Sequence, residues 1–296
     1  MMKKNPHNLV AKFREQYIED SLPDFLYHYT SIEALKSIIN NGEIYATVAD
    51  YIASDPSEIT IAKTIALKIL NKRKKDFNGK KRLYENCKKA IESSDRSKDI
   101  QCICSLSEEE NLLSQWRAYC PKGGVSIGFS GDRIRKNNGD PCIQNGTSVD
   151  NYNDYIREDY LYKCIYEPEE QKRKINQLFD FFLEQNISLI GPFWKMIQSF
   201  SYSFKHESFK EEKEWRLAYW PDKNKLKDRV KDSTLIPYWP FLTVDHNNKS
   251  VIDKIMIGPS RDKEKLRKYI SSYLKDLGTQ FSHIEVDVTK TPWQPL

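Results

Sequence analysis

The sequence predicts an α+β protein whose core is a mixed or antiparallel β-sheet. Hydrophobic residues make up 39% of the 296, and 17 Tyr, 13 Phe and 6 Trp add aromatic surface, so the chain can bury a sizeable core. Segments typical of strands outnumber segments typical of helices, and the two kinds do not alternate as a doubly wound parallel fold requires. No internal repeat is visible. We therefore expect one elaborated domain over residues 1–296.

The first fifty residues predict a helix followed by a strand-helix-strand unit. Apolar periodicity and aromatic composition place these elements at Lys4–Asp20 (helix), Phe25–Tyr29 (strand), Ile32–Asn40 (helix) and Glu43–Thr47 (strand). Thr30 and Ser31 offer N-caps to the second helix, and Asn41-Gly42 supplies its C-terminal stop.

Residues 57–100 predict an inserted helical hairpin. Its helices run from about Ser57 to Lys72 and from Lys80 to Ser93, with a turn at Phe77-Asn78-Gly79. The preceding Asp55-Pro56-Ser57-Glu58 has the composition of a helix start, because Asp55 can cap the first turn and Pro56 suits the first helical position. We expect an insertion and not a domain with its own core.

The remaining two thirds of the chain supply most of the sheet. The expected strands are Gln101–Ser107, Gly124–Phe129, Leu161–Tyr166, Glu214–Tyr219, Thr234–Val244, Val251–Ile257 and Ile284–Val288. The expected helices are Glu108–Tyr119, Glu169–Phe204 with a break near Gly191-Pro192, and Arg261–Leu277. Residues Gly131–Tyr155 show little periodicity and are expected to form a surface loop.

The sequence indicates a cytoplasmic protein without membrane contact. Met1–Val10 lacks the apolar run of a secretory signal, and no stretch approaches the roughly 18 apolar residues of a membrane span. The pair Cys102 and Cys104 lacks the second pair of ligands that a zinc site needs, so no metal is expected.

One segment carries a strong excess of positive charge. From Lys72 to Lys89 there are nine basic residues against Asp76 and Glu85, a net charge of +7, whereas the whole chain carries +5. Such a segment can attract the phosphates of a nucleic acid. A lysine-rich solvated hairpin is the alternative, because few aromatic residues are present to stack on bases.

Two resemblances to known families depend on short motifs. The run Leu26-Tyr27-His28-Tyr29-Thr30-Ser31, with the helix and strand that follow, resembles the opening of ADP-ribosyltransferase-like domains. A wider set resembles DUF2971, a family of uncharacterised bacterial proteins. Its motifs are His28-Tyr29-Thr30-Ser31, Asp55-Pro56-Ser57-Glu58, Ser105-Leu106-Ser107, Gln115-Trp116-Arg117-Ala118-Tyr119, Gly124-Val125-Ser126-Ile127-Gly128-Phe129, residues 211–217 and Ile257-Gly258-Pro259. The first resemblance implies a split sheet of the ADP-ribosyltransferase-like type.

The transferase resemblance implies an NAD site around the first strand. It makes His28 the ligand of a ribose hydroxyl, with Thr30 in the same motif, and a neutral imidazole can both donate and accept as a diol requires. It also implies an aromatic residue stacked on nicotinamide, for which we prefer Tyr45 over Tyr29; core packing is the alternative for either. Arg117 follows an anchoring tryptophan and is a candidate for a phosphate contact; a solvated helix residue is the alternative.

The resemblance further implies a catalytic glutamate on a later strand, and Glu214 is our choice. Strand alternation places Trp215, Leu217 and Tyr219 on a core-facing side, and Glu212, Glu214 and Arg216 on the other. Glu214 beside Arg216 could stabilise a ribosyl cation while the guanidinium pairs a phosphate of the dinucleotide. A surface ion pair is the alternative, and Glu211 and Glu212 are alternatives in register.

Sequence motifs for two other kinds of enzyme are weaker. Gly124-Val125-Ser126-Ile127-Gly128 fits G-x-S-x-G, but a turn precedes the serine where a nucleophile elbow needs a strand. A metal-dependent nuclease would need carboxylates such as Asp55, Glu58, Glu207 and Glu214 to converge, which their spacing does not require.

The expected function is therefore that of an NAD-binding, ADP-ribosyltransferase-like enzyme. It would cleave the nicotinamide–ribose bond and transfer ADP-ribose to a macromolecule or to water. The alternative is a non-catalytic nucleotide- or nucleic-acid-binding module in phage defence or stress response, with Lys72–Lys89 as its contact surface. The sequence predicts no oligomeric state.

Overall fold

The structure is a computed structural model that describes residues 9, 12–13, 16–17, 21–52, 60–92, 100–138, 161–185, 190–219, 221, 223–231, 233–245 and 249–292, with the backbone alone at 135–138. Three expected features fall mostly or wholly outside these residues, namely the helix Lys4–Asp20, the helix start Asp55–Glu58 and the loop Gly131–Tyr155. None of the described helices combines the length and the apolar character that crossing a membrane requires.

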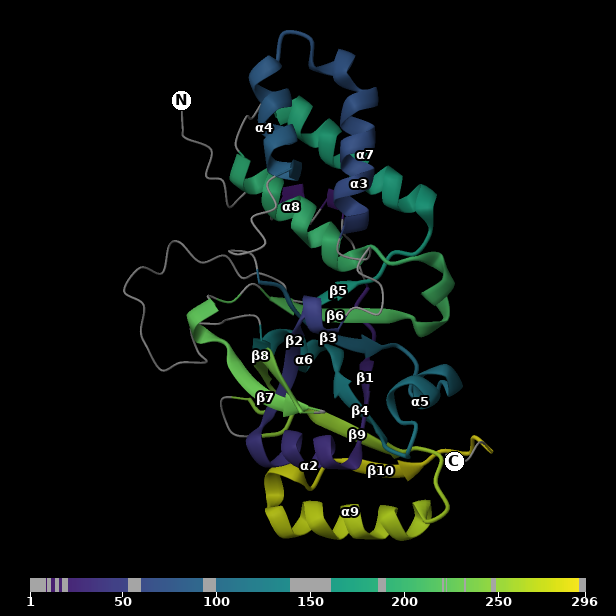
Figure 1. The fold of residues 1–296 in the computed structure, drawn as a ribbon. Helices are drawn as coiled ribbons and strands as arrows, with labels where there is room; N and C mark the ends of the chain where they lie inside the picture. Colours follow the sequence, from purple (N-terminus) through teal and green to yellow (C-terminus); the bar gives the residue numbers. More distant parts are fainter. Residues whose placement is uncertain are drawn as a thin grey trace.

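A ten-stranded sheet forms the centre of the described part of the chain (Figure 1). Its main path is β10-β9-β4-β1-β3-β2-β8-β7, and β6 joins β3 and β5 to the side. The strands are β1 (Phe25–Thr30), β2 (Glu43–Val48), β3 (Cys102–Ser107), β4 (Val125–Ser130), β5 (Leu161–Lys163), β6 (Glu214–Tyr219), β7 (Lys227–Lys231), β8 (Thr234–Leu242), β9 (Ile252–Ile257) and β10 (Glu285–Val288). All described pairings between these strands are antiparallel except β9 with β10, which confirms a mixed sheet in an α+β fold.

The sheet branches at β3. This strand pairs with β6 along its whole length, but it shares one residue pair with β1 and two with β2. A single row of paired residues therefore crosses three strands, from Tyr27 on β1 through Ser107 on β3 to Glu214 on β6.

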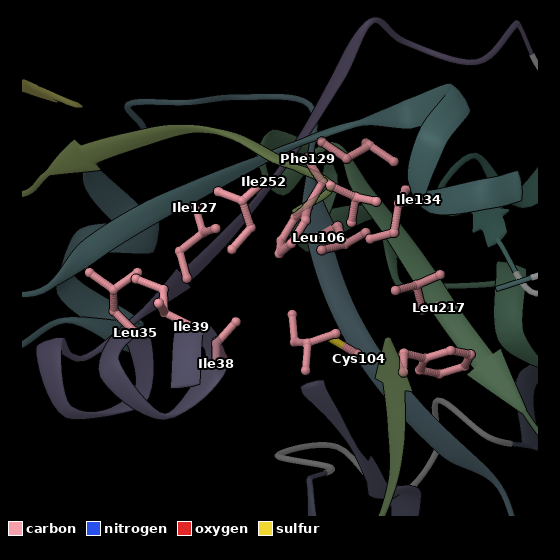
Figure 2. Packing of buried hydrophobic residues seen from close by; sticks show 14 of the residues in the cluster. Leu35, Ile38, Ile39, Cys104, Leu106, Ile127, Phe129, Ile134, Leu217 and Ile252 are labelled. Atoms are coloured by element: carbon pink, nitrogen blue, oxygen red, sulfur yellow. The ribbon is translucent and has the colours of Figure 1, made fainter. Parts of the chain in front are cut away.

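The main hydrophobic core lies between the sheet and helices α2 (Ile32–Asn41) and α9 (Lys263–Leu277). The hydroxyl of Ser31 accepts the amide of Ala34 and caps α2, while Gly42 ends it in the left-handed conformation, with φ +64°. Leu35, Ile38 and Ile39 form the buried stripe of α2, facing the sheet residues of the same core (Figure 2).

Four helices form a second layer with a hydrophobic cluster of its own (Figure 1). They are α3 (Ile61–Lys72), α4 (Lys81–Glu92), α7 (Pro168–Gln185) and α8 (Ile190–Ser203). The expected hairpin is present as α3 and α4, and it buries its apolar faces against α7 and α8 in a phenylalanine-rich core. Of the long helix expected over Glu169–Phe204, the structure describes α7 to Gln185 and α8 from Ile190, and residues 186–189 lie outside the described ranges. Pro192 sits in the first turn of α8, where a missing amide is tolerated.

Two expected elements begin differently in the structure. The helix expected from Glu108 begins only at Leu113 as α5 (Leu113–Tyr119), because the preceding backbone bonds to side chains: the hydroxyl of Tyr29 accepts from the Leu112 amide at 2.8 Å and donates to the Glu109 carbonyl at 2.6 Å. The expected loop opens with a helix, α6 (Gly131–Asn138), whose first amide donates to the Asp24 carbonyl.

The edge strand β7 was not among the expected elements. Its sequence, Lys-Asp-Arg-Val-Lys, has a single apolar residue, and four of its five residues are exposed. Charged side chains protect an edge strand from pairing with another chain, and they also remove the alternation by which strands are found in sequences.

Candidate functional site

The row Tyr27, Ser107 and Glu214 brings the expected His28 and Glu214 to one cavity. Since neighbouring strands lie about 4.8 Å apart, two strand spacings separate the backbones of Tyr27 and Glu214, or about 10 Å. The cavity has a volume of about 40 Å³. It is lined by residues of β1, β3, α5, the start of β6 and the segment that leads into β6: Tyr27, His28, Tyr29, Ser105, Leu106, Gln115, Tyr119, Glu212 and Glu214.

One ring nitrogen of His28 is already hydrogen-bonded within the protein. Its Nδ1 lies 3.0 Å from the carbonyl oxygen of Ser105 on the neighbouring strand, so Nδ1 carries the proton and donates it, leaving Nε2 as an acceptor. Burial lowers the pKa of His28, although the Ser105 carbonyl acts in the opposite direction. The imidazole is therefore neutral at neutral pH, with Nε2 available to accept a hydroxyl proton.

Glu214 is a buried carboxylate fixed by two cations. Its Oε1 lies 3.0 Å from Nε of Arg216, and its Oε2 lies 2.7 Å from Nζ of Lys205. Burial opposes ionisation, but the charges of Arg216 and Lys205 outweigh it and lower the pKa of Glu214 to about 2. The side chain is 5% exposed, so this negative charge stands at the cavity with little solvent screening.

Lys205 is the residue of this cluster that sequence reasoning missed. Its Nζ contacts Glu214 and also Oε2 of Glu212 at 2.6 Å, and its side chain is 8% exposed. Burial favours the neutral amine, but the two carboxylates outweigh burial and raise the pKa of Lys205. Lys205 lies between α8 and the turn that precedes β6, where no periodic pattern marks a buried lysine.

Arg216 lies in the same buried cluster but does not line the cavity. Its Nη1 donates to the carbonyl of Tyr202 at 3.1 Å, and its Nη2 and Nε donate to Glu214. The expected alternation of β6 is present, since Trp215 and Leu217 belong to the main core while Glu214 and Arg216 face the end of α8.

The other expected NAD contacts lie outside the cavity lining, apart from Tyr29. The ring of Tyr45 packs on Tyr238 at 4.1 Å between centroids, at the β2–β8 pair. Arg117 is exposed on α5, and Thr30 accepts from the thiol of Cys120 through its carbonyl. The hydroxyl of Tyr29 is engaged by the backbone of residues 109 and 112, and its ring packs on Trp116, so it anchors α5 to β1.

The described residues do not form the active site of a serine hydrolase or of a metal-dependent nuclease. Ser126 is completely buried within β4, which denies it the exposed strand-to-helix turn of a nucleophile elbow. Within the ranges that the structure describes, no three His, Cys, Asp or Glu side chains gather as metal ligands. Asp55 and Glu58 of the nuclease hypothesis lie outside those ranges.

The assembled site therefore consists of two carboxylates, one neutral imidazole and a buried ammonium. A cavity of about 40 Å³ accommodates water. Pockets for drug-sized ligands are typically about 300–1,000 Å³, so a nucleotide enters only if the cavity widens.

Comparison with known proteins identifies a family for part of the chain. Residues 115–217 match the family model described as "Protein of unknown function (DUF2971)". No curated protein and no solved structure matches the chain. The matched segment runs from α5 to β6 and contains Lys205, Glu212 and Glu214, whereas His28 precedes it. The match covers about a third of the chain and includes the motifs Gln115–Tyr119 and Gly124–Phe129 and residues 211–217, so over this segment the chain is similar to the DUF2971 family.

Proposed function

We propose that the protein is an ADP-ribosyltransferase-like enzyme that binds NAD at the cavity of His28 and Glu214. It would cleave the bond between nicotinamide and ribose and transfer ADP-ribose to a macromolecule or to water. The observation that carries the proposal is that these two side chains, 186 positions apart in the sequence, line one cavity.

The chemistry of the two groups suits this reaction. When the bond from ribose C1′ to the nicotinamide nitrogen breaks, its electron pair leaves with nicotinamide and positive charge develops on the ribose. A carboxylate that stays ionised in a buried site stabilises that charge, and the low pKa of Glu214 meets this requirement. Nε2 of His28 accepts a hydrogen bond from a ribose hydroxyl, because Nδ1 is already committed to Ser105. The acceptor oxygen or nitrogen then bonds to C1′ and loses a proton.

The size of the cavity sets a condition on the proposal. NAD is far larger than about 40 Å³, so binding requires the walls to separate. The wall that carries Gln115 and Tyr119 is the short helix α5, which is the smallest described α-helix of the chain.

Release of nicotinamide from NAD by the purified full chain tests the proposal. We expect turnover by the wild-type protein and a loss of about 100-fold or more in His28→Ala and Glu214→Gln samples that circular dichroism shows to be folded. Glu211→Gln is the matched control, since Glu211 is exposed and does not line the cavity. Absence of both turnover and a thermal shift with NAD, in the presence of candidate acceptors, would remove the proposal.

A second candidate function is supported by the basic segment Lys72–Lys89. Its turn between α3 and α4 lies at the end of the helical layer far from β6, and the segment continues through most of α4 (Figure 1). Six of its cations are exposed and have no acidic partner among the described residues: Lys72, Lys74, Lys75, Lys81, Arg82 and Lys89. By contrast, Arg73 pairs with Asp76 and Asp180, and Lys80 donates to the Leu183 carbonyl. This surface suits a nucleic acid or another polyanion in a non-catalytic binding module.

Salt dependence of nucleic-acid binding tests this second candidate. If all six cations contact phosphates, log Kd should rise with log salt concentration with a slope of about 5 on duplex DNA. Replacing Lys74, Lys75, Lys81 and Arg82 by glutamine should reduce that slope by more than half. The control replaces the exposed Lys265 and Lys268 of α9. If the four substitutions in the basic segment leave binding unchanged, or if both sets of substitutions weaken binding equally, this surface is not the nucleic-acid binding site.

A further inference from the structure

We infer that Lys205 is a positioning residue of the site, whose ammonium holds the carboxylates of Glu212 and Glu214 side by side at the cavity wall. The inference depends on the proposed function only where NAD turnover is concerned. The arrangement itself can be tested without substrate.

The geometry of the ammonium carries the inference. Nζ of Lys205 lies 2.6 Å from Oε2 of Glu212 and 2.7 Å from Oε2 of Glu214, both within charge-assisted hydrogen-bond distance. Both glutamates line the cavity, and Lys205 does not. Arg216 contacts Glu214 as a second cation. Lys205 thus links the two carboxylates through one ammonium group.

The fold holds this lysine in place from several directions. Its amide donates to the carbonyl of Ile165 at 3.2 Å. Its own carbonyl accepts from Nε2 of Gln171 at 2.9 Å, and the same nitrogen donates to Ile165 at 2.7 Å. Gln171 is itself buried, and the ring of Phe209 lies 4.8 Å from Nζ. The backbone of Lys205 is therefore fixed before its side chain contributes to the site.

Two neighbouring carboxylates require such a cation. Without it, their repulsion raises the pKa of at least one of them, and a protonated Glu214 could not stabilise a developing positive charge. A lysine whose ammonium does not contact Glu214 in solution would leave the titration of Glu214 unchanged. An ammonium that bridges the two carboxylates lowers the pKa of Glu214, so removing it raises that pKa, and this difference decides the experiment.

The direct test follows the ¹³C signal of the Glu214 carboxyl carbon by NMR as pH is lowered, in full-length protein labelled at glutamate. The signal is assigned by its loss in Glu214→Gln. In Lys205→Met we expect the titration midpoint to rise by about 1–3 pH units, while Lys205→Arg keeps it low. Lys210→Met is the matched control, because Lys210 lies in the same segment and pairs with Glu167 on the surface. An unchanged midpoint in Lys205→Met overturns the inference.

A second measurement covers the case in which Lys205→Met does not fold. Ammonium protons of a buried, doubly bonded lysine exchange slowly with water, so Lys205 should give an ¹H–¹⁵N signal at neutral pH. Glu212→Gln removes one partner and leaves Lys205 charged, and exchange should accelerate at least several-fold. The control is Glu211→Gln. If the ammonium protons of Lys205 exchange as fast in the wild-type protein as in Glu212→Gln, the bridge does not form in solution.

The NAD assay separates this inference from the proposed function. If the wild-type protein turns over NAD, Lys205→Met should shift the acidic limb of the kcat profile upward in pH, and Lys205→Arg should restore it. A profile that Lys205→Met leaves unshifted contradicts the positioning role even though the enzyme is active. If no protein turns over NAD but the Glu214 midpoint moves, the positioning role holds and the proposed function fails.

Discussion

Replacing Glu214 by glutamine is expected to lower the free energy of unfolding by about 3–5 kcal/mol at pH 7. The carboxylate pairs with Arg216 and Lys205, whose side chains are 4% and 8% exposed. Glutamine keeps the shape but removes the charge, so Arg216 and Lys205 each lose an ion pair with Glu214 inside the protein. The cost is mainly that of removing one charge from a buried cluster of charges and not the value of one hydrogen bond.

The pH dependence of that loss follows from the lowered pKa of Glu214. Burial alone would raise the pKa, but the two cations bring it to about 2 from an ordinary value of 4.5. The unfolded chain therefore takes up this proton first as the pH falls, and the native state loses this stabilisation between about pH 4.5 and 2. Above about pH 5 the contribution is fully present, so the wild type and Glu214→Gln should differ most there and converge in acid.

Urea unfolding at pH 7 and at pH 3.5 measures both effects. Glu264→Gln is the matched control, because Glu264 pairs with Arg267 on the surface of α9 with 61% of its side chain exposed. Its unfolding free energy should change by less than about 0.5 kcal/mol. Equal losses in the two variants, or a Glu214→Gln loss that persists unchanged at pH 3.5, would contradict the buried charge cluster.

Replacing Trp116 by alanine is expected to cost about 3–5 kcal/mol of stability and to abolish activity at the cavity. Trp116 is completely buried, its ring meets Tyr29 edge-on at 4.7 Å, and its indole nitrogen donates to Asn111 at 2.8 Å. Gly258 packs so closely that a Cβ there would lie 2.7 Å from the ring. Truncation leaves a large void where three elements meet.

Activity should suffer because Trp116 fixes α5, whose Gln115 and Tyr119 line the cavity. Denaturation and the NAD assay on the same samples measure the two effects. Tyr269→Ala is the control, since this aromatic residue is 69% exposed on α9 and should change stability by less than about 0.5 kcal/mol. Trp116→Ala with wild-type stability would mean that α5 is held by other contacts.

Local physics explains why many elements could be predicted from the sequence. The unit β1-α2-β2 follows the expected boundaries to within one residue, because a capping serine, a stripe of apolar residues and a C-terminal glycine act over a few neighbouring positions. The alternation of β6 also follows from strand geometry alone, and it correctly separates Trp215 from Glu214. Where side chains from distant segments bond to the backbone, as Tyr29 does ahead of α5, the expected helix starts too early.

The sequence by itself determined the α+β class, the mixed sheet, the helical hairpin and the residues on each face of β6. The tertiary structure alone decided that the second face of β6 is buried and not open to solvent, because the end of α8 covers it. It also brought His28 near Glu214 through the β1–β3–β6 register and placed Lys205 between two glutamates. The physical reason is range: caps and alternation act between near neighbours in the chain, whereas burial and charge pairing depend on which distant segments meet.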